Sequence, residues 1–291
     1  MSTDDKYPEE SGRRRFVKGV VGSATLSTVG ATSAGAINPM TSTSGVGGGF
    51  TTFVGIENTD GPAPRGMPMI PVEIDEDDFL KGTWPDVKEV QEGGRTVTIA
   101  EQQLGGQTYS SEWFQYCGVE TYAGVRPEAD QDTYFRYASD PFYEWQSNEA
   151  EAGEKVPVSD FADYATWSND IGERANGKPA VVTWRSQDVP DEQTMVVQIL
   201  RMPEGRYQEM RDRVSGAMRD WLDAATPEDD TFIAWLNKCT HFCCVPQFKG
   251  LAGSANFGAE NQVYCQCHQS VYDPYSPTET SFTAFPRPLE E

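Results

Sequence analysis

Both histidines of the chain and five of its six cysteines lie in two short clusters near the C-terminus. Thiolate sulfur and imidazole nitrogen bind zinc, and they also hold the irons of some two-iron clusters. The Cys-x-His pair of the first cluster is tighter than the gaps of about two to four residues that zinc fingers use. The residue types therefore indicate a metal or iron–sulfur site, with both kinds of centre still open. The two clusters read Cys239-Thr-His-Phe-Cys-Cys244 and Cys265-Gln-Cys-His-Gln-Ser-Val-Tyr272.

The segments before these clusters must supply the scaffold that positions them. Runs rich in β-branched residues at 96–100, 180–184 and 195–200 predict strands. Apolar residues spaced three and four apart predict one helix over 203–226, with its apolar stripe in the core. A short apolar run at 232–236 leads into the first cluster. We expect a folded, strand-rich head that carries the clusters near its C-terminal end.

The chain is strongly acidic, with 45 Asp and Glu against 23 Lys and Arg and a net charge of −22. A phosphate backbone needs a basic groove, so the composition argues against binding to nucleic acid. It also argues against docking of a soluble face on anionic lipid. The 33 aromatic residues are enough for a real core. The 8 Lys beside 15 Arg favour the hydrated surface of a halophilic protein over that of an ordinary acidic protein.

The N-terminal part of the chain has a different charge pattern. Residues 1–18 contain five basic and four acidic side chains, and no charged residue occurs from 19 to 56. The acid excess therefore belongs entirely to the distal part. A Gly- and Ser-rich stretch at 41–50 and the prolines that follow it predict a flexible tether over 39–71.

Arg13 and Arg14 begin a run, Arg-Arg-Arg-Phe-Val-Lys, that resembles the twin-arginine export motif. We interpret 1–18 as the cytoplasmic end and 19–38 as a signal or transmembrane anchor, which places the head on the outer face of the cytoplasmic membrane. A disordered Gly/Ser/Thr tail is the alternative. Small residues at 34–36 would also permit cleavage, so removal or retention of the segment stays open.

The two clusters closely resemble the boxes of Rieske iron–sulfur proteins, Cys-Thr-His-x-Gly-Cys and Cys-Pro-Cys-His-x-Ser-x-Tyr. The resemblance implies one [2Fe–2S] cluster, in which Cys239 and Cys265 hold one iron while His241 and His268 hold the other. Zinc is the weaker interpretation, because it does not account for the additional cysteine pair.

The resemblance also implies a disulfide between Cys244 and Cys267, the mark of the high-potential branch of the family. Two positions depart from the family pattern. Cys243 replaces the usual glycine, which leaves it as an alternative partner for Cys267, and Gln266 replaces a proline without removing a ligand. The remote Cys117 is expected to be a buried apolar residue rather than a ligand.

In the family, the residues that match Ser270 and Tyr272 donate hydrogen bonds to a bridging sulfide and to a ligand sulfur. Such donors stabilise the more negative reduced cluster and raise its reduction potential. Turn formation before Asp273-Pro274 is the alternative role for these two residues. Near the C-terminus, Pro286 and Pro288 resemble the loop that covers the cluster in quinol-oxidising complexes.

A mainly β, antiparallel Rieske-type fold is implied for the head at 72–291, with a small cluster-binding subdomain at about 233–290. The Gly-Lys-Pro run at 177–182 resembles the strand that opens the base of that fold. One N-terminal transmembrane helix would complete the chain.

The function implied is that of the redox subunit in a cytochrome bc-type quinol oxidoreductase. His268 would hydrogen-bond quinol and accept its proton, with His241 as its exposed neighbour. The implied partners are a cytochrome b-type membrane subunit, quinol, and an external electron carrier such as a cytochrome c or a copper protein. The alternatives are the small Rieske subunit of an exported molybdenum oxidase of the arsenite oxidase type, and a zinc-binding surface module.

Overall fold

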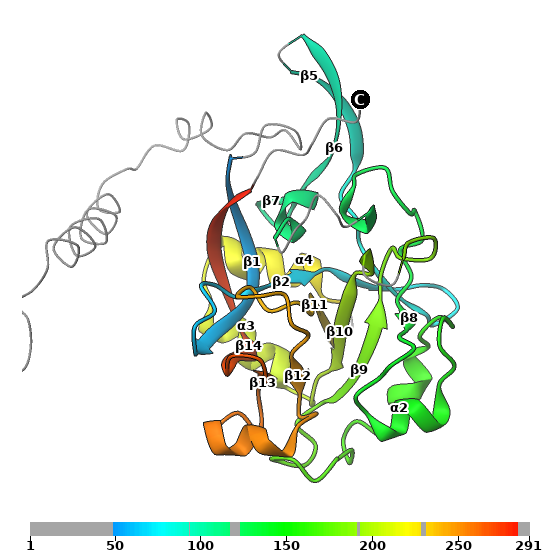
Figure 1. The fold of residues 1–291 in the computed structure, drawn as a ribbon, viewed down its shortest axis with the longest axis vertical. Coiled ribbons are helices and arrows are strands. Elements are labelled where there is room, and N and C mark those ends of the chain that lie inside the picture. Colours follow the sequence, from blue (N-terminus) through cyan, green and yellow to red (C-terminus); the bar gives the residue numbers. More distant parts are fainter. Residues whose placement is uncertain (1–48, 93, 117–122, 191–192, 228–230, 285–291) are drawn as a thin grey trace, which may run out of the picture. The chain divides into compact units, whose positions relative to one another are not determined.

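The predicted signal and anchor, Cys117, and the proline-rich end with Pro286 and Pro288 lie outside the residues that the structure describes. Within the described part, no helix combines the length and apolar character that a membrane crossing requires. The structure is a computed structural model (Figure 1), and it describes residues 49–92, 94–116, 123–190, 193–227 and 231–284.

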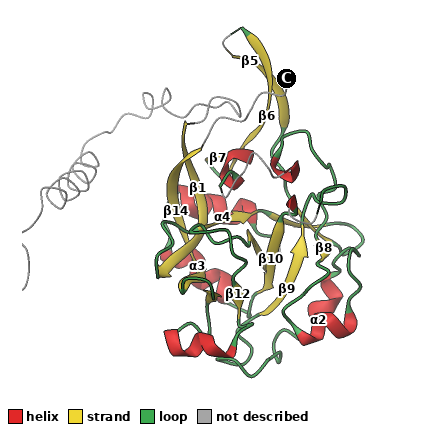
Figure 2. Cartoon of the chain, viewed as in Figure 1, coloured by secondary structure: helices red, strands yellow, loops and turns green. Residues whose placement is uncertain are grey.

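The structure is mainly β, as predicted, and its largest element is a nine-stranded antiparallel sheet (Figure 2). The strand order in this sheet is β12-β13-β14-β1-β2-β11-β10-β9-β8, and two smaller sheets contain β3-β4 and β5-β6-β7. The strands are β1 (Gly49–Asp60), β2 (Met67–Ile70), β3 (Val72–Ile74), β4 (Leu80–Gly82), β5 (Val87–Glu92), β6 (Arg95–Leu104), β7 (Gln107–Ser110), β8 (Arg136–Tyr137), β9 (Lys178–Thr183), β10 (Val196–Arg201), β11 (Phe232–Leu236), β12 (Gln247–Phe248), β13 (Val263–Cys265) and β14 (Ser270–Ala284).

The described helices are short. Three of them are α-helices, and the others are single 3₁₀ segments that connect strands. Their bounds are η1 (Ser111–Phe114), η3 (Ala123–Val125), α2 (Glu144–Glu149), η4 (Val158–Phe161), α3 (Arg206–Arg213), α4 (Ala217–Ala225) and η6 (Ala252–Phe257).

The three runs predicted as strands are confirmed, since they lie in β6, β9 and β10. Nearly every residue of β9 is buried, and so are the central residues of β10, which explains their continuous apolar runs. Large aromatic side chains fill the core against the sheet. Four fully buried tryptophans are Trp113, Trp184, Trp221 and Trp235.

The single helix predicted over 203–226 is wrong, because two helices, α3 and α4, occupy this stretch. The break contains Gly216, whose φ of 53° lies in the left-handed region that glycine enters without steric cost. Buried side chains of both helices still join the core. The predicted apolar stripe is therefore present, although the helix is not continuous.

The C-terminal boundary of the tether predicted over 39–71 is wrong, because a strand begins within this range. Residues 39–48 lie outside the described part, but from Gly49 the chain forms β1. This strand pairs with β14, from Gly49 opposite Ala284 to Asp60 opposite Val271. Pairing with a strand from the other end of the chain gives order to a stretch whose local composition predicts a linker. The folded head therefore begins no later than Gly49, rather than at residue 72.

Both clusters of cysteine and histidine occupy connections between strands of the large sheet. The first cluster lies in the loop between β11 and β12, and the second forms the turn between β13 and β14. Cys265 and Ser270 face each other across that turn as the last residue of β13 and the first of β14. The scaffold therefore presents two separate loops whose relative placement depends on the sheet.

Asn237 stabilises the base of the first loop through hydrogen bonds of its side chain and backbone. Its buried side chain donates from Nδ2 to the Pro246 carbonyl at 2.9 Å and accepts at Oδ1 from Trp235 Nε1 at 3.3 Å. Its backbone N–H donates to the Val196 carbonyl at 2.8 Å. One residue thus joins both ends of the loop to the sheet.

Replacing Asn237 with leucine should reduce the free energy of unfolding by about 2–4 kcal/mol, because it leaves a buried carbonyl and a buried indole N–H unpaired. Denaturant unfolding at one fixed salt concentration measures this loss. Asn148→Leu on the exposed face of α2 is the matched control, with an expected change within about 0.5 kcal/mol. Equal losses in the two variants would show that Asn237 does not anchor the loop.

Candidate metal centre

The first loop closes on itself through backbone hydrogen bonds. Cys239 N–H donates to the Cys244 carbonyl at 2.7 Å, and Cys243 N–H donates to the Cys239 carbonyl at 2.9 Å. The φ of Cys243 is 61°, in the region where glycine is favoured over residues with a Cβ. This backbone conformation explains why the resembling pattern has glycine here. Cys243 keeps the same turn at some steric cost.

The second loop is a tight turn with four exposed residues, 266–269, between two buried ones. Gln269 N–H donates to the Cys265 carbonyl at 2.9 Å, and Gln269 has a φ of 64°. Cys267 and His268 lie exposed at the tip, whereas Cys265 and Ser270 are buried at the base. The turn therefore offers one sulfur to the interior and one imidazole to the outside.

A disulfide between Cys244 and Cys267 joins the two loops. This is the pairing that the resemblance implies, and it decides against Cys243 as the partner of Cys267. Cys243 is disulfide-bonded as well. Among the described cysteines, Cys239 and Cys265 are the two that form no disulfide. These are the two cysteines predicted as ligands.

Cys239 and Cys265 place two buried sulfurs in hydrogen-bonding contact with each other. A hydrogen bond from Cys265, with a further one from Tyr272, lowers the pKa of Cys239 in spite of its burial. The pKa of Cys265 is raised, because its thiol donates to Cys239 and is itself buried. The hydrogen bond places the two sulfurs beside each other, as two ligands of one metal atom would be.

His241 and His268 form a second pair, with ring centroids 4.7 Å apart and planes at 80°. His268 is exposed and His241 is half-buried. The Nδ1 atom of His241 is buried and lacks a hydrogen-bond partner among the described residues. An unpaired buried nitrogen is costly, and coordination to a metal would satisfy it.

Two pairs of ligands match two metal atoms better than they match one. Within the described part of the chain, the side chains that gather three ligand atoms within 4.8 Å are those of Cys244, Cys265 and Cys267. The disulfide occupies two of these sulfurs. A single zinc ion needs four ligand atoms around one point, each about 2.0–2.3 Å away. A sulfur pair and a separate imidazole pair favour a two-iron centre instead.

Tyr272 makes a hydrogen bond to the sulfur of Cys239, a candidate ligand. Its fully buried hydroxyl donates to Cys239 Sγ at 3.1 Å, while Thr240 N–H donates to the hydroxyl oxygen at 3.3 Å. Burial, together with the hydrogen bond to Cys239, raises the pKa of Tyr272. The hydroxyl therefore keeps its proton and remains a donor, which stabilises negative charge on the sulfur.

Ser270 is fully buried and lies directly opposite Cys265 in the pairing of β13 with β14. Residues opposite each other in an antiparallel pair project their side chains from the same face. The Ser270 hydroxyl therefore lies on the face of the sheet that carries the Cys265 sulfur. Its hydrogen bond to a bridging sulfide involves an atom outside the protein chain and stays a prediction.

A third segment frames the site and is missed by the sequence analysis. This segment is the loop 61–66 between β1 and β2, called the strap below. A Cβ on Gly61, which has a φ of 84°, would lie 2.6 Å from the Gln269 carbonyl oxygen, so glycine permits the close approach. The Gly-Pro-Ala-Pro run is the available signal, yet prolines alone predict a stiff linker rather than a site loop.

The strap makes one backbone hydrogen bond to a side chain of each cluster. Ala63 N–H donates to Ser270 Oγ at 3.1 Å, and the Arg65 carbonyl accepts from Thr240 Oγ1 at 2.6 Å. Three loops, rather than two, therefore surround the candidate ligands.

Two cationic side chains lie next to these loops. The Arg65 guanidinium lies over the rings of Phe282, at 4.5 Å, and Tyr116, at 5.4 Å. Burial lowers its pKa, partly offset by Tyr116 and Tyr272, and burial lowers the pKa of Lys238 to about 8. The Arg65 guanidinium interacts electrostatically with Tyr272, the residue that donates to Cys239.

The exposed end of the site combines imidazole with an apolar ring. Phe242 is 66% exposed, and its ring centroid lies 4.4 Å from that of His241 and 5.3 Å from that of His268. A large apolar side chain in water beside a hydrogen-bonding imidazole is suited to binding an apolar molecule that carries a polar oxygen.

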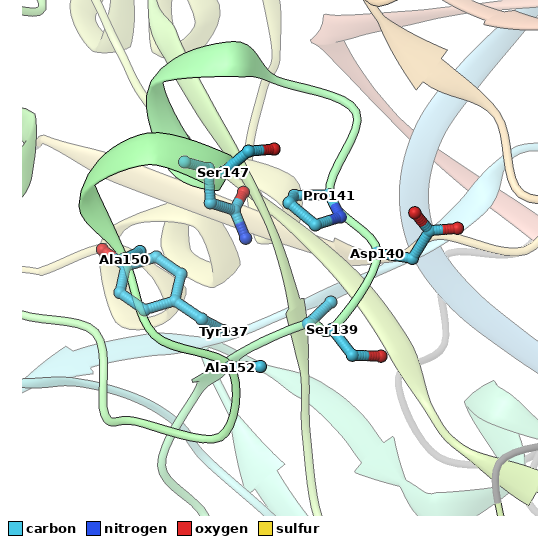
Figure 3. A pocket seen from close by; sticks show the side chains of 9 residues that line it. Tyr137, Ser139, Asp140, Pro141, Ser147, Ala150 and Ala152 are labelled. Atoms are coloured by element: carbon cyan, nitrogen blue, oxygen red, sulfur yellow. The ribbon is translucent and has the colours of Figure 1, made fainter.

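A pocket beside α2 is lined by residues between 137 and 152 (Figure 3). Gln146 in its wall is hydrogen-bonded in both directions to the backbone of Val181, at 2.7 and 2.9 Å. Tyr137 donates to Asp160 at 2.8 Å. These polar groups already form hydrogen bonds within the protein. No cysteine or histidine is among the residues that line the pocket.

Comparison with protein-family models, with curated proteins and with solved structures finds no match in any of the three. The residues and geometry of the two loops and the strap are therefore the basis for a functional conclusion.

Replacing both Cys244 and Cys267 with serine should reduce the free energy of unfolding by about 3 kcal/mol, because the cross-link restricts the unfolded chain. Equilibrium unfolding of the double variant without reductant measures the loss, with the disulfide-bonded wild-type protein as the reference. Peptide mapping of the wild type without reductant should yield one cross-linked peptide containing both positions. A map that joins Cys267 to a different cysteine would contradict the pairing.

Proposed function

We propose that the chain is a Rieske-type electron-transfer protein with one [2Fe–2S] cluster. One iron would be held by Cys239 and Cys265 and the other by His241 and His268. The observation that carries the proposal is the division of these ligands into a buried sulfur pair and an imidazole pair with one exposed ring, on disulfide-linked loops.

A bound cluster of this kind supplies one-electron redox chemistry. The protein's own groups favour its more negative reduced form. Tyr272 donates to the Cys239 sulfur at 3.1 Å. A donor to a ligand sulfur would stabilise the reduced cluster and raise its reduction potential.

Quinol is the proposed electron donor. His268 is exposed at the tip of the second loop, and Phe242 provides an apolar surface beside it. His268 would accept a hydrogen bond and then a proton from the quinol hydroxyl. The second electron of quinol would pass to a cytochrome b-type subunit, and the chain would pass its own electron to an external carrier, such as a cytochrome c or a copper protein.

The proposed location is the outer face of the cytoplasmic membrane, reached by twin-arginine export. The disulfide between Cys244 and Cys267 suits an oxidising compartment. The anchor proposed at 19–38 would hold the head near a membrane partner. The net charge of −22 would favour a carrier with basic patches, or contacts that depend on burial at high salt.

Electron paramagnetic resonance and metal analysis test the cluster. The reduced protein should give a two-iron signal, with two irons and two acid-labile sulfides per chain. His268→Ala should lose the signal because an iron loses a ligand, whereas Gln266→Ala, exposed in the same turn, should keep it. A silent wild-type sample with one zinc per chain would overturn the proposal, and a normal signal in His268→Ala would overturn the ligand assignment.

Quinol oxidation by membranes that contain the chain tests the electron donor. A quinol analogue that occupies the quinol pocket should slow reduction of the cluster at least about tenfold, because it keeps the donor from His268. Stopped-flow absorbance with added quinol measures this rate. Unchanged reduction by quinol, together with co-purification of a molybdenum subunit, would point to the molybdenum oxidase alternative.

A further inference from the structure

We propose that the strap, residues 61–66, orders the two hydroxyl protons that point toward sulfur in the site. Ala63 and Thr240 are then positioning residues, which act on the cluster through Ser270 and Tyr272. This inference rests on the proposed [2Fe–2S] cluster and deepens it.

The strap contacts Ser270 directly, through the backbone amide of Ala63. A serine hydroxyl has one proton to donate and can rotate to choose its acceptor. Ala63 N–H donates to Ser270 Oγ at 3.1 Å in a buried contact. The proton of Ser270 therefore points away from the strap. The Ser270 hydroxyl can therefore donate its proton on the face of the sheet that carries the Cys265 sulfur. Cys265 lies opposite Ser270 in the strand pairing.

Because Ala63 has a proline on each side, only its own amide can donate to Ser270 from this part of the strap. Pro62 and Pro64 lack a backbone N–H, so Ala63 contributes the one amide donor of these three residues. Prolines also restrict the backbone of the strap, which limits movement of that donor. The run Pro-Ala-Pro thus presents a single amide to Ser270.

The strap is connected to Tyr272 indirectly, through Thr240. Its hydroxyl oxygen accepts from Thr240 N–H at 3.3 Å, which leaves its proton for Cys239 Sγ at 3.1 Å. The competing Thr240 Oγ1 lies farther away, at 3.5 Å. That hydroxyl gives its own proton to the Arg65 carbonyl of the strap at 2.6 Å.

The strap carbonyl therefore fixes Thr240, and the backbone of Thr240 in turn fixes the orientation of the Tyr272 hydroxyl. Both sulfur-directed donors are held in the orientation that stabilises added negative charge before an electron arrives. Such preorganisation favours reduction, because no donor has to reorient when the charge appears. Loss of a strap contact should lower the equilibrium constant for reduction without removing any ligand.

A double-mutant cycle measured by redox titration of the cluster signal tests this coupling. Thr240→Val should lower the equilibrium constant for reduction about fivefold, the effect expected for one buried hydrogen bond, whereas Thr240→Ser keeps the hydroxyl and should restore it. In a Tyr272→Phe background, Thr240→Val should add no further loss, because its effect passes through the missing hydroxyl.

The corresponding cycle for the other contact uses Ala63→Pro with Ser270→Ala, and Ala63→Gly as the variant that retains the amide. The effect of Ala63→Pro should vanish in the Ser270→Ala background. If Ala63→Pro does not fold, the Thr240 cycle decides. Losses that add fully in the double variants, or an unchanged titration in Thr240→Val, would overturn the inference while leaving the cluster in place. A wild-type protein without the two-iron signal would instead overturn the proposed function.

Discussion

The disulfide between Cys244 and Cys267 is the constraint on which the candidate site depends, because the loops it joins leave the large sheet at different places. One loop follows β11 and the other connects β13 with β14. Free loops would lose conformational entropy each time their side chains met. The covalent link removes most of that cost. It therefore helps to keep the sulfurs of Cys239 and Cys265 in contact and the two imidazole rings 4.7 Å apart.

Burial gives the two ends of the candidate site different environments. A thiolate in the interior is costly unless hydrogen-bond donors surround it, and the protein provides them. Cys265 and Tyr272 donate to Cys239, and the strap accepts a hydrogen bond from the neighbouring Thr240 hydroxyl. His268 remains in water beside Phe242. The site thus has a buried end that stabilises negative charge and an exposed end that can contact another molecule.

The candidate ligands could be predicted from sequence because metal chemistry demands particular side chains at close spacing. Cys239, His241, Cys265 and His268 lie within two short runs, and folding has only to bring those runs together. The predicted strands follow from local apolar patterns in the same way. The left-handed φ of Cys243 also shows why a glycine is usual there. The break at Gly216 escaped prediction, because the apolar spacing continues across it while the backbone does not.

The sequence by itself determined which atoms can bind metal, where the acidic charge lies, and which cysteines are candidates for a cross-link. Each of these depends on residue type and short-range spacing. The tertiary structure decided that Cys244 rather than Cys243 bonds Cys267, that residues 49–60 form a strand, and that Gly61–Gly66 frames the site. These outcomes depend on pairing between residues far apart in the chain. Strand β1 is ordered by β14, and the strap is held by Thr240 and Ser270, partners that local composition cannot reveal.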